Sequence, residues 1–270
     1  MKPSVRFAVA SLCLLLPSMP FAQEAGGFVE KADRTAGRAP WTPAQIEGFL
    51  PARGEFTFPF PYGTPGVRLT NATDCGGADC VLPTGSSSWR NTNNHRGRET
   101  MLVFLGLRGV GPTLFSYSKS GGQVKNLGPL FEADSPFARH SGEGWYFSGT
   151  EPTTLYVTGA LGATLQRYDV IARTFETVFD ASAHFGADRY IWQSHSSDDD
   201  NVHSATLRDL TSHAKLGCLA YREDTRRYSY YAALDDFSEC QIDRSGRWLV
   251  IKEDVDGLPG RENLVVDLET

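Results

Sequence analysis

The sequence lacks the features of several large classes of protein. Beyond its first 22 residues, no stretch of the 270-residue chain is apolar enough to cross a bilayer. It carries 26 basic against 32 acidic residues, and this mild acidity argues against a nucleic-acid partner, which needs a basic footprint. G-x-S-x-G elbows, phosphate-binding loops and H-E-x-x-H helices are absent. No motif therefore supports a serine hydrolase, a nucleotide-binding protein or a zincin.

Convincing amphipathic helices are also scarce, whereas aromatic residues and glycines are plentiful. This balance favours an all-β fold. One short helix is expected after Thr42, which stands at the N-cap with Pro43 at N1 and Gln45 completing a capping box. Residues 51–66 are rich in Pro, Phe and Gly and predict an extended segment, and residues 67–70 are a strand candidate that could close the last sheet. Residues 23–85 are thus predicted to form an N-terminal extension.

Residues 1–22 have the pattern of an export signal. Lys2 and Arg6 precede an apolar run over residues 7–16, and cleavage after Ala22 would suit a signal peptidase. The run is too short to span a bilayer, although a retained anchor is the alternative. We expect the mature chain to be soluble and extracytoplasmic, either periplasmic or secreted.

Cysteine is sparse, with five residues of which Cys13 lies in the signal. The remaining four are an even number in an oxidising compartment, which favours two disulfides. Cys75 and Cys80 flank two glycines that allow a tight loop, and Cys218 and Cys240 are the other expected pair. A zinc site at the first pair would need a second cysteine pair at ligand spacing, and none is present.

From about residue 86 the chain repeats. The segments 114–127, 165–178 and 218–231 align without a gap, each as a strand, a polar turn and a second strand. Two alignment columns hold equivalent residues: Tyr117, Tyr168 and Tyr221 in one, and Val124, Phe175 and Tyr228 in the other. A fourth copy begins at residue 264.

A second pattern precedes each of these segments. It consists of a short strand, a tight polar turn and an apolar strand, and it places four residues in equivalent positions: His95, His140, His195 and Asp243. Four strands per unit at a period of roughly 50 residues is typical of a β-propeller blade. We therefore predict an all-β propeller of four-stranded antiparallel blades over residues 86–270.

The last repeat resembles the TolB-type, WD-repeat-like propeller unit. The resemblance rests on Gly246, Arg247, Trp248 and the Asp267-Leu268 pair, and it is partial in the other three repeats, which lack the usual proline. It implies a fold and no activity, since propellers of this kind include binding proteins and enzymes. About four blades are visible, the last incomplete, so we expect the natural chain to continue with further blades and this sequence to be a fragment of a larger propeller.

The first strand of each propeller blade lines the central channel, where ligands bind. The polar residues that the sequence assigns to these strands are Arg90, Asn91, Asn93, His95, Arg139, His140, Gln193, His195, Glu239, Gln241 and Asp243. Histidines converging on one axis could bind a divalent metal or act as acid and base. Alternatively, each histidine only hydrogen-bonds the backbone of its turn, as serine or aspartate does in related repeats.

Two histidines flank the acidic run Asp198–Asp200. If the hairpin is centred on Asp199, His195 and His203 oppose each other directly and could share a metal, whereas a one-residue shift sends one to the opposite face. Calcium at the aspartates is conceivable, but the run lacks the glycine and glutamate of a calcium loop. An ordinary solvated turn is the favoured interpretation.

Two functions fit this pattern. The first is a binding module for a glycan or a protein. The alternative is a polysaccharide lyase that cleaves uronate-containing glycans by β-elimination, an activity found among propeller proteins. It would use His140 or His195 as the base and Arg90 or Arg139 as the carboxylate partner, with His195 and His203 as possible ligands of a divalent metal.

Overall fold

The structure is a computed structural model. It describes residues 40–59, 63–77, 80–82, 90–140, 142, 144–254, 257, 260 and 262–269. The predicted signal peptide lies outside these residues. The chain divides into two compact units, residues 1–49 and 50–270. Of the helices in the described ranges, none has both the length and the apolar character needed to cross a membrane.

The first unit contains the predicted short helix, α1 (Pro43–Phe49). Its capping box forms as expected: the Thr42 backbone N–H donates to Gln45 Oε1 (2.8 Å), and the Gln45 N–H donates to Thr42 Oγ1 (3.3 Å). Trp41 packs edge-on against Phe49, with ring centroids 5.1 Å apart.

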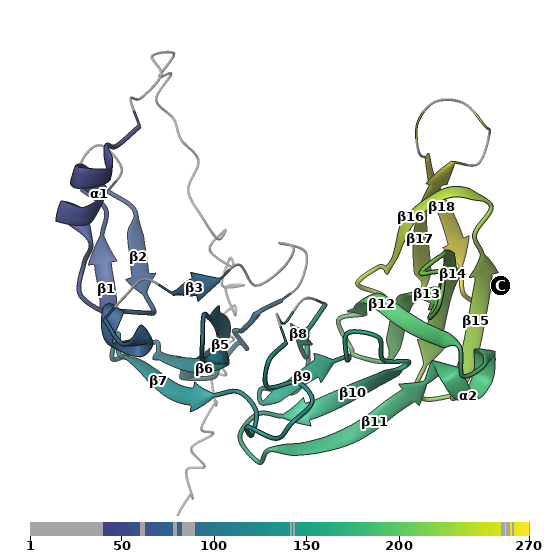
Figure 1. Cartoon of the computed structure of the whole chain (residues 1–270), viewed down its shortest axis with the longest axis horizontal. Coiled ribbons are helices and arrows are strands. Elements are labelled where there is room, and N and C mark those ends of the chain that lie inside the picture. The colour runs from purple at the N-terminus through teal and green to yellow at the C-terminus, as the bar shows by residue number, and fades with distance from the viewer. Residues whose placement is uncertain are drawn as a thin grey trace, which may run out of the picture. The chain divides into compact units, whose positions relative to one another are not determined.

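The second unit is built from antiparallel sheets that follow one another in chain order (Figure 1). Before them lie β1 (Gly54–Thr57), β2 (Pro65–Arg68) and a 3-10 turn (Ala72–Cys75). Blade 1 comprises β3 (Val81–Leu82), β4 (Thr92–Asn93), β5 (Thr100–Leu107), β6 (Gly111–Ser118) and β7 (Val124–Pro129). Blade 2 comprises β8 (Tyr146–Phe147), β9 (Thr154–Val157), β10 (Thr164–Asp169) and β11 (Thr174–Asp180), and α2 (Ala181–Phe185) follows it.

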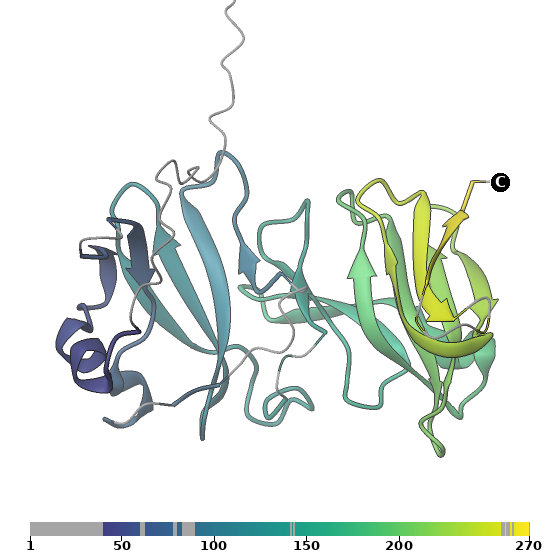
Figure 2. The ribbon, with the colours of Figure 1, turned by 90° about the horizontal axis from the view of Figure 1, so that it is seen from above.

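Blade 3 comprises β12 (Arg189–Ser196), β13 (Val202–Asp209), β14 (Lys215–Arg222) and β15 (Arg227–Ala232). Blade 4 has three strands within the described residues: β16 (Asp235–Ile242), β17 (Trp248–Asp254) and β18 (Glu262–Asp267). Figure 2 shows the same succession of sheets from above. The predicted all-β fold of antiparallel propeller blades is confirmed.

The strand register confirms the repeat read from the sequence. Three tyrosines on the third strands pair with the predicted partners on the fourth strands: Tyr117 with Val124, Tyr168 with Phe175, and Tyr221 with Tyr228. The columns align without a gap because the third and fourth strands of each blade form one continuous hairpin.

The turns between the first and second strands contradict the predicted alignment of three histidines with Asp243. These turns begin at Ser148, Ser197 and Asp243 in blades 2 to 4. The backbone N–H of each donates to a carbonyl oxygen across the turn, with an N···O distance of 2.9 Å. The predicted equivalence of His140 and His195 with Asp243 is therefore wrong. His195 lies within β12, two residues before its turn, and His140 lies in an irregular segment ahead of β8.

The hydrophobic core is shared between neighbouring blades. Phe104 of blade 1 packs with Trp145 and Phe147 at the start of blade 2. Separate buried clusters join blade 2 to blade 3 and blade 3 to blade 4. Both faces of an inner blade are covered, so β13 is buried without interruption from Val202 to Leu207.

Both predicted disulfides are present. Cys75–Cys80 closes the small loop before blade 1. Cys218–Cys240 joins β14 to β16 and so links blade 3 covalently to blade 4. The expected strand at residues 67–70 forms differently, because β2 ends at Arg68 and pairs antiparallel with β1 and not with the last blade.

Asp200 binds the turn of blade 2 to that of blade 3. Its buried carboxylate accepts hydrogen bonds from the backbone N–H groups of Gly149 and Thr150 (both 3.0 Å) and from the hydroxyls of Ser148 (2.5 Å) and Thr150 (2.7 Å). The expectation of an ordinary solvated turn is wrong for this residue, because the neighbouring blade supplies the donors that offset its burial.

We expect Asp200→Asn to lower the free energy of unfolding by about 2–3 kcal/mol, because an amide offers these four donors only one accepting oxygen. Urea denaturation measures the loss. The matched control is Asp198→Asn, which removes only an exposed pair with Arg244 and should cost under about 1 kcal/mol. Equal losses in both variants would contradict the proposed role of Asp200.

Candidate functional site

A pocket of about 320 Å³ lies where the first strands of the blades meet. We call it the inner pocket, and its lining residues are Arg90, Tyr146, His195, Ser196, Asp198, Ile242 and Arg244. Arg90 precedes β4 of blade 1, and the others come from the first strands or first turns of blades 2, 3 and 4. All four blades therefore contribute to one site.

Arg90 is held in place by backbone contacts to blade 2. The Phe147 N–H donates to the Arg90 carbonyl (2.8 Å). Three residues on, the Asn93 side chain donates to the carbonyls of Glu151 (3.2 Å) and Pro152 (2.6 Å). Gly149 is required nearby, since a Cβ there would lie 2.4 Å from the Asp198 carbonyl oxygen and 3.2 Å from Arg90 Nη1.

His195 faces the inner pocket from β12. The strand is bulged between Trp192 and His195, where Gln193 adopts a positive φ of 54°, and such a bulge redirects the side chains that follow. Burial, and then the positive charge of Arg90, lower the pKa of His195 to about 4. The imidazole is consequently neutral at neutral pH.

The predicted opposition of His195 and His203 is wrong. His203 pairs with Ser196 and His195 pairs with Ser204, so the two imidazoles point to opposite faces of blade 3. The turn causes this shift, because it closes between Ser197 and Val202 and is not centred on Asp199. Over the part of the chain that the structure describes, no group of three or more His, Cys, Asp or Glu side chains is gathered as a metal site.

His203 instead belongs to a buried chain of hydrogen bonds. Ser196 Oγ lies 2.8 Å from Tyr146 Oη and 2.6 Å from His203 Nδ1. His203 Nε2 lies 2.7 Å from Glu223 Oε1, and the other Glu223 oxygen accepts from Arg167. We call this the Ser196–His203–Glu223 chain. Only its Tyr146 and Ser196 end reaches the inner pocket.

The charges along this chain are well defined. Burial alone would raise the pKa of Glu223, but the hydrogen bonds from His203 and Arg167 outweigh it and lower the pKa. Burial raises the pKa of Tyr146, so its phenol stays protonated. Sequence reasoning missed Ser196 and Glu223, which no motif marks. They meet because β13 and β14 bring Glu223 beside Asn201, where the Glu223 N–H donates to the Asn201 carbonyl (2.9 Å).

Arg139 and His140 lie elsewhere. Both line a separate hollow of about 620 Å³ beside the turn between β5 and β6 of blade 1. The His140 ring packs 5.3 Å from that of Trp145, and Arg139 is exposed. The structure thus brings Arg90 and His195 together and leaves Arg139 and His140 outside the inner pocket.

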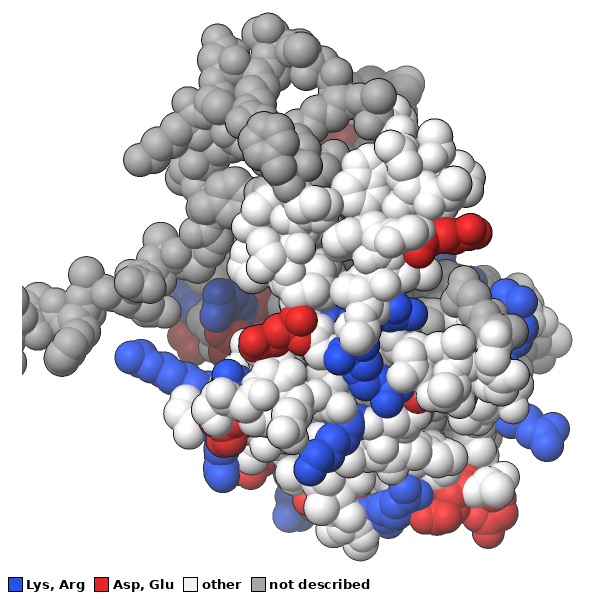
Figure 3. Space-filling view, turned by 90° about the vertical axis from the view of Figure 1, so that its left-hand side faces the viewer, with Lys and Arg blue, Asp and Glu red and all other residues white. Residues whose placement is uncertain are grey.

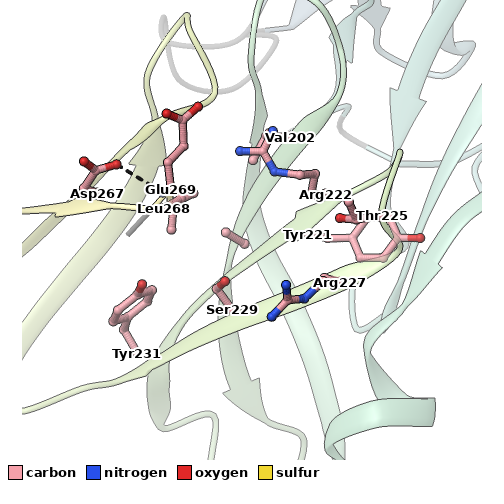
Figure 4. Close-up of a pocket in the computed structure, with 11 residues that line it drawn as sticks. Val202, Tyr221, Arg222, Thr225, Arg227, Ser229, Tyr231, Asp267, Leu268 and Glu269 are labelled. Carbon is pink, nitrogen blue, oxygen red and sulfur yellow. Dashed lines mark hydrogen bonds between the residues drawn. The ribbon is translucent and has the colours of Figure 1, made fainter.

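A third hollow, of about 520 Å³, lies between blades 3 and 4. Figure 4 shows Arg222 and Arg227 of blade 3 on one side and Asp267 and Glu269 of blade 4 on the other. Because this hollow has both basic and acidic side chains, it favours neither a negatively nor a positively charged ligand. On the face shown in Figure 3, basic and acidic side chains are likewise interspersed. The inner pocket is the stronger candidate because it combines a shifted histidine with the end of a buried polar chain.

We expect His195 to make stability depend on pH. Between pH 6.5 and about 4 the unfolded imidazole takes up a proton that the folded one does not, so the wild type loses up to about 3 kcal/mol as the pH falls through this range. His195→Gln should lose less over the same range in urea denaturation. His184→Gln, at an exposed site, is the control and should follow the wild type. Parallel curves for wild type and His195→Gln would contradict the shifted pKa.

No family model matches the sequence, and no curated protein is significantly similar to it. Solved structures similar to the chain include oligogalacturonate lyase from Vibrio parahaemolyticus, at 10% identity and a TM-score of 0.49, covering 80% of this chain and 61% of that one. The chain therefore spans less than two thirds of that protein.

TolB from Acinetobacter baumannii is similar at 14% identity and a TM-score of 0.36, covering 62% of this chain and 41% of that one. A putative TolB from Agrobacterium tumefaciens is similar at 12% identity and a TM-score of 0.37, covering 59% and 52%. Likeness at this level carries nothing about activity. The antiparallel blades of this structure agree with the propeller fold that the TolB-type resemblance of the last repeat implies.

Proposed function

We propose that the protein is an extracytoplasmic binding module whose inner pocket receives a carboxylate group, with an acidic glycan as the ligand. The observation that carries this proposal is the state of the two arginines. Arg244 is paired with Asp198 (2.7 Å), whereas no described residue forms an ion pair with Arg90. Arg90 therefore supplies a guanidinium to the pocket without a competing carboxylate from the described part of the protein.

A carboxylate suits this site for two reasons. The guanidinium fork matches the two oxygens of a carboxylate. The neutral His195 adds a ring N–H donor without adding charge, and a bound carboxylate would offset the Arg90 charge that lowers the pKa of His195. Binding should then raise that pKa and draw a proton into the site, so affinity should rise as the pH falls from 7 towards 5.

The predicted signal peptide and the two disulfides support a periplasmic or secreted location for this function. Polymers of uronic acids are encountered there, and one of their repeating carboxylates could bind Arg90. A protein ligand would use the same pocket through an Asp or Glu side chain, and the choice of probe separates the two.

Arg90→Gln should weaken the binding of a galacturonic acid oligomer at least about 30-fold, because it removes the charge and the bidentate hydrogen bonds together. Isothermal titration calorimetry on the full chain measures this. Arg227→Gln, in the hollow between blades 3 and 4, is the matched control and should bind as the wild type does. Uronate affinity that Arg90→Gln leaves unchanged, or equal affinity for a neutral glucose oligomer, would overturn the proposal.

A second function, uronate lysis by β-elimination, is favoured by the placement of His195 beside Arg90. The sequence predicts His195 as one of two candidate bases and Arg90 as one of two candidate carboxylate partners. A carboxylate bound at Arg90 would strengthen His195 as a base by offsetting the charge that lowers its pKa. His195 would take the proton from the carbon next to the carboxylate. A C=C bond would form as the C–O bond on the adjacent carbon breaks, and the departing oxygen would leave as a hydroxyl with a proton from water.

A lyase releases unsaturated sugars, which appear as new ultraviolet absorbance when the protein meets a uronate polymer. We expect His195→Ala to abolish that signal and His140→Ala to preserve it, because His140 lies outside the inner pocket. Turnover that survives His195→Ala would remove this residue as the base. Uronate binding with no turnover in the wild type would leave the binding module as the function.

A further inference from the structure

We propose that Ser196 is an activated nucleophile for acyl transfer, with His203 as its general base and Glu223 positioning that base. The proposal rests on the Ser196–His203–Glu223 chain, whose hydrogen bonds are 2.6 Å and 2.7 Å long. A hydroxyl, an imidazole and a carboxylate bonded in this order form the arrangement that activates serine in hydrolases of unrelated folds. Such an arrangement is recognised by geometry, so the absence of a G-x-S-x-G elbow does not count against it.

The direction of the hydrogen bonds follows from the charges. Glu223 is ionised, because His203 and Arg167 lower its pKa, and a carboxylate can only accept. His203 Nε2 therefore donates to Glu223, and in the neutral form of the ring Nδ1 is an acceptor. The Ser196 hydroxyl donates to Tyr146 Oη (2.8 Å) and lies 2.6 Å from Nδ1, so rotation about its own C–O bond turns its proton from the phenol to the imidazole. In that orientation the serine can pass its proton to His203.

The location of the chain distinguishes a reactive serine from a buried structural one. The His203 side chain is fully buried, with 0% exposure, between blades 2 and 3, where Tyr156 packs 5.0 Å from its ring. Ser196 and Tyr146, at the other end, line the inner pocket. The proton-accepting ring of His203 is therefore buried in the core, whereas the Ser196 hydroxyl lines a pocket that a ligand can enter.

The substrate class is an acyl ester. Ser196 Oγ attacks the ester carbonyl and forms a C–O bond, while its proton passes to His203 Nδ1. The tetrahedral intermediate then expels the alcohol, which takes the proton from Nδ1, and the acyl group stays on Ser196. Water attacks this acyl-enzyme in a second step, gives a proton to His203, and releases the carboxylic acid and the restored Ser196 hydroxyl.

The lining of the pocket narrows the substrate further, in a part of the inference that rests on the proposed function. Arg90 supplies positive charge beside Ser196 and Tyr146. It would hold the carboxylate of an acidic sugar while an acyl ester on the same molecule reaches Ser196. We therefore infer an esterase that removes acyl groups, such as acetyl, from a uronate-containing glycan.

Labelling with a fluorophosphonate, which reacts covalently with activated serines, tests the central claim on the full chain. We expect one adduct by intact mass, placed on Ser196 by peptide mapping, and loss of the adduct in Ser196→Ala. Ser229→Ala, on the outer strand of the same blade, is the matched control and should label as the wild type does. Hydrolysis of p-nitrophenyl acetate should fall at least about 100-fold in Ser196→Ala.

Glu223 needs a second measurement, because its role in positioning His203 must be told apart from a role in stability. Glu223→Gln should slow labelling at least about 10-fold while its thermal unfolding temperature stays near that of the wild type, and Glu223→Asp should recover part of the rate. A purely structural Glu223 would instead change the unfolding temperature without affecting the labelling of the folded protein.

The result separates this inference from the proposed function. No adduct on Ser196, together with uronate binding that depends on Arg90, overturns the nucleophile and leaves the binding module standing. An adduct on Ser196 without uronate binding supports the nucleophile and removes the acidic glycan. An adduct that persists in Ser196→Ala overturns the assignment of Ser196.

Discussion

The structure depends on one constraint: the inner blades are buried on both faces, so a polar group that lies between two blades must find its partner there. An unpaired buried polar group costs about 1–3 kcal/mol, and a charged one costs more. Asp200 meets this constraint with four hydrogen bonds from the turn of blade 2. His203 meets it with Ser196 on one side and Glu223 on the other. The polar chain between blades 2 and 3 is a consequence of the packing.

The inner pocket is where this constraint is relaxed. The first strands end there, and the polar groups of four blades reach the same space. Arg90 and His195 share it without repelling each other, because burial and the Arg90 charge keep the imidazole neutral. A site with a neutral imidazole and a guanidinium that no described carboxylate pairs with is prepared for an anion, and the binding of that anion is linked to protonation of the histidine.

Much of the fold was predictable because the third and fourth strands of blades 1 to 3 repeat with constant spacing, which fixed the tyrosine columns and their partners. The site was harder to predict. The first turn of blade 2 opens at Ser148, eight residues after His140, whereas that of blade 3 opens at Ser197, two residues after His195, so the alignment of the histidines failed. Arg90 and His195, two of the polar residues that the sequence assigns to the first strands, line the same pocket, but Glu223 carries no pattern that relates it to Ser196.

The failed prediction that His195 and His203 oppose each other and the presence of the polar chain have the same cause. Had the hairpin been centred on Asp199, His203 would have faced His195 on one side of blade 3. The turn between Ser197 and Val202 instead pairs His203 with Ser196, on the face towards blade 2, and pairs His195 with Ser204. Ser204 Oγ accepts from the Ile242 N–H of blade 4 (2.9 Å), so that pair belongs to the opposite face. This shift of register places the two imidazoles on opposite faces of blade 3. His195 lies in the pocket with Arg90, and His203 lies beside Ser196.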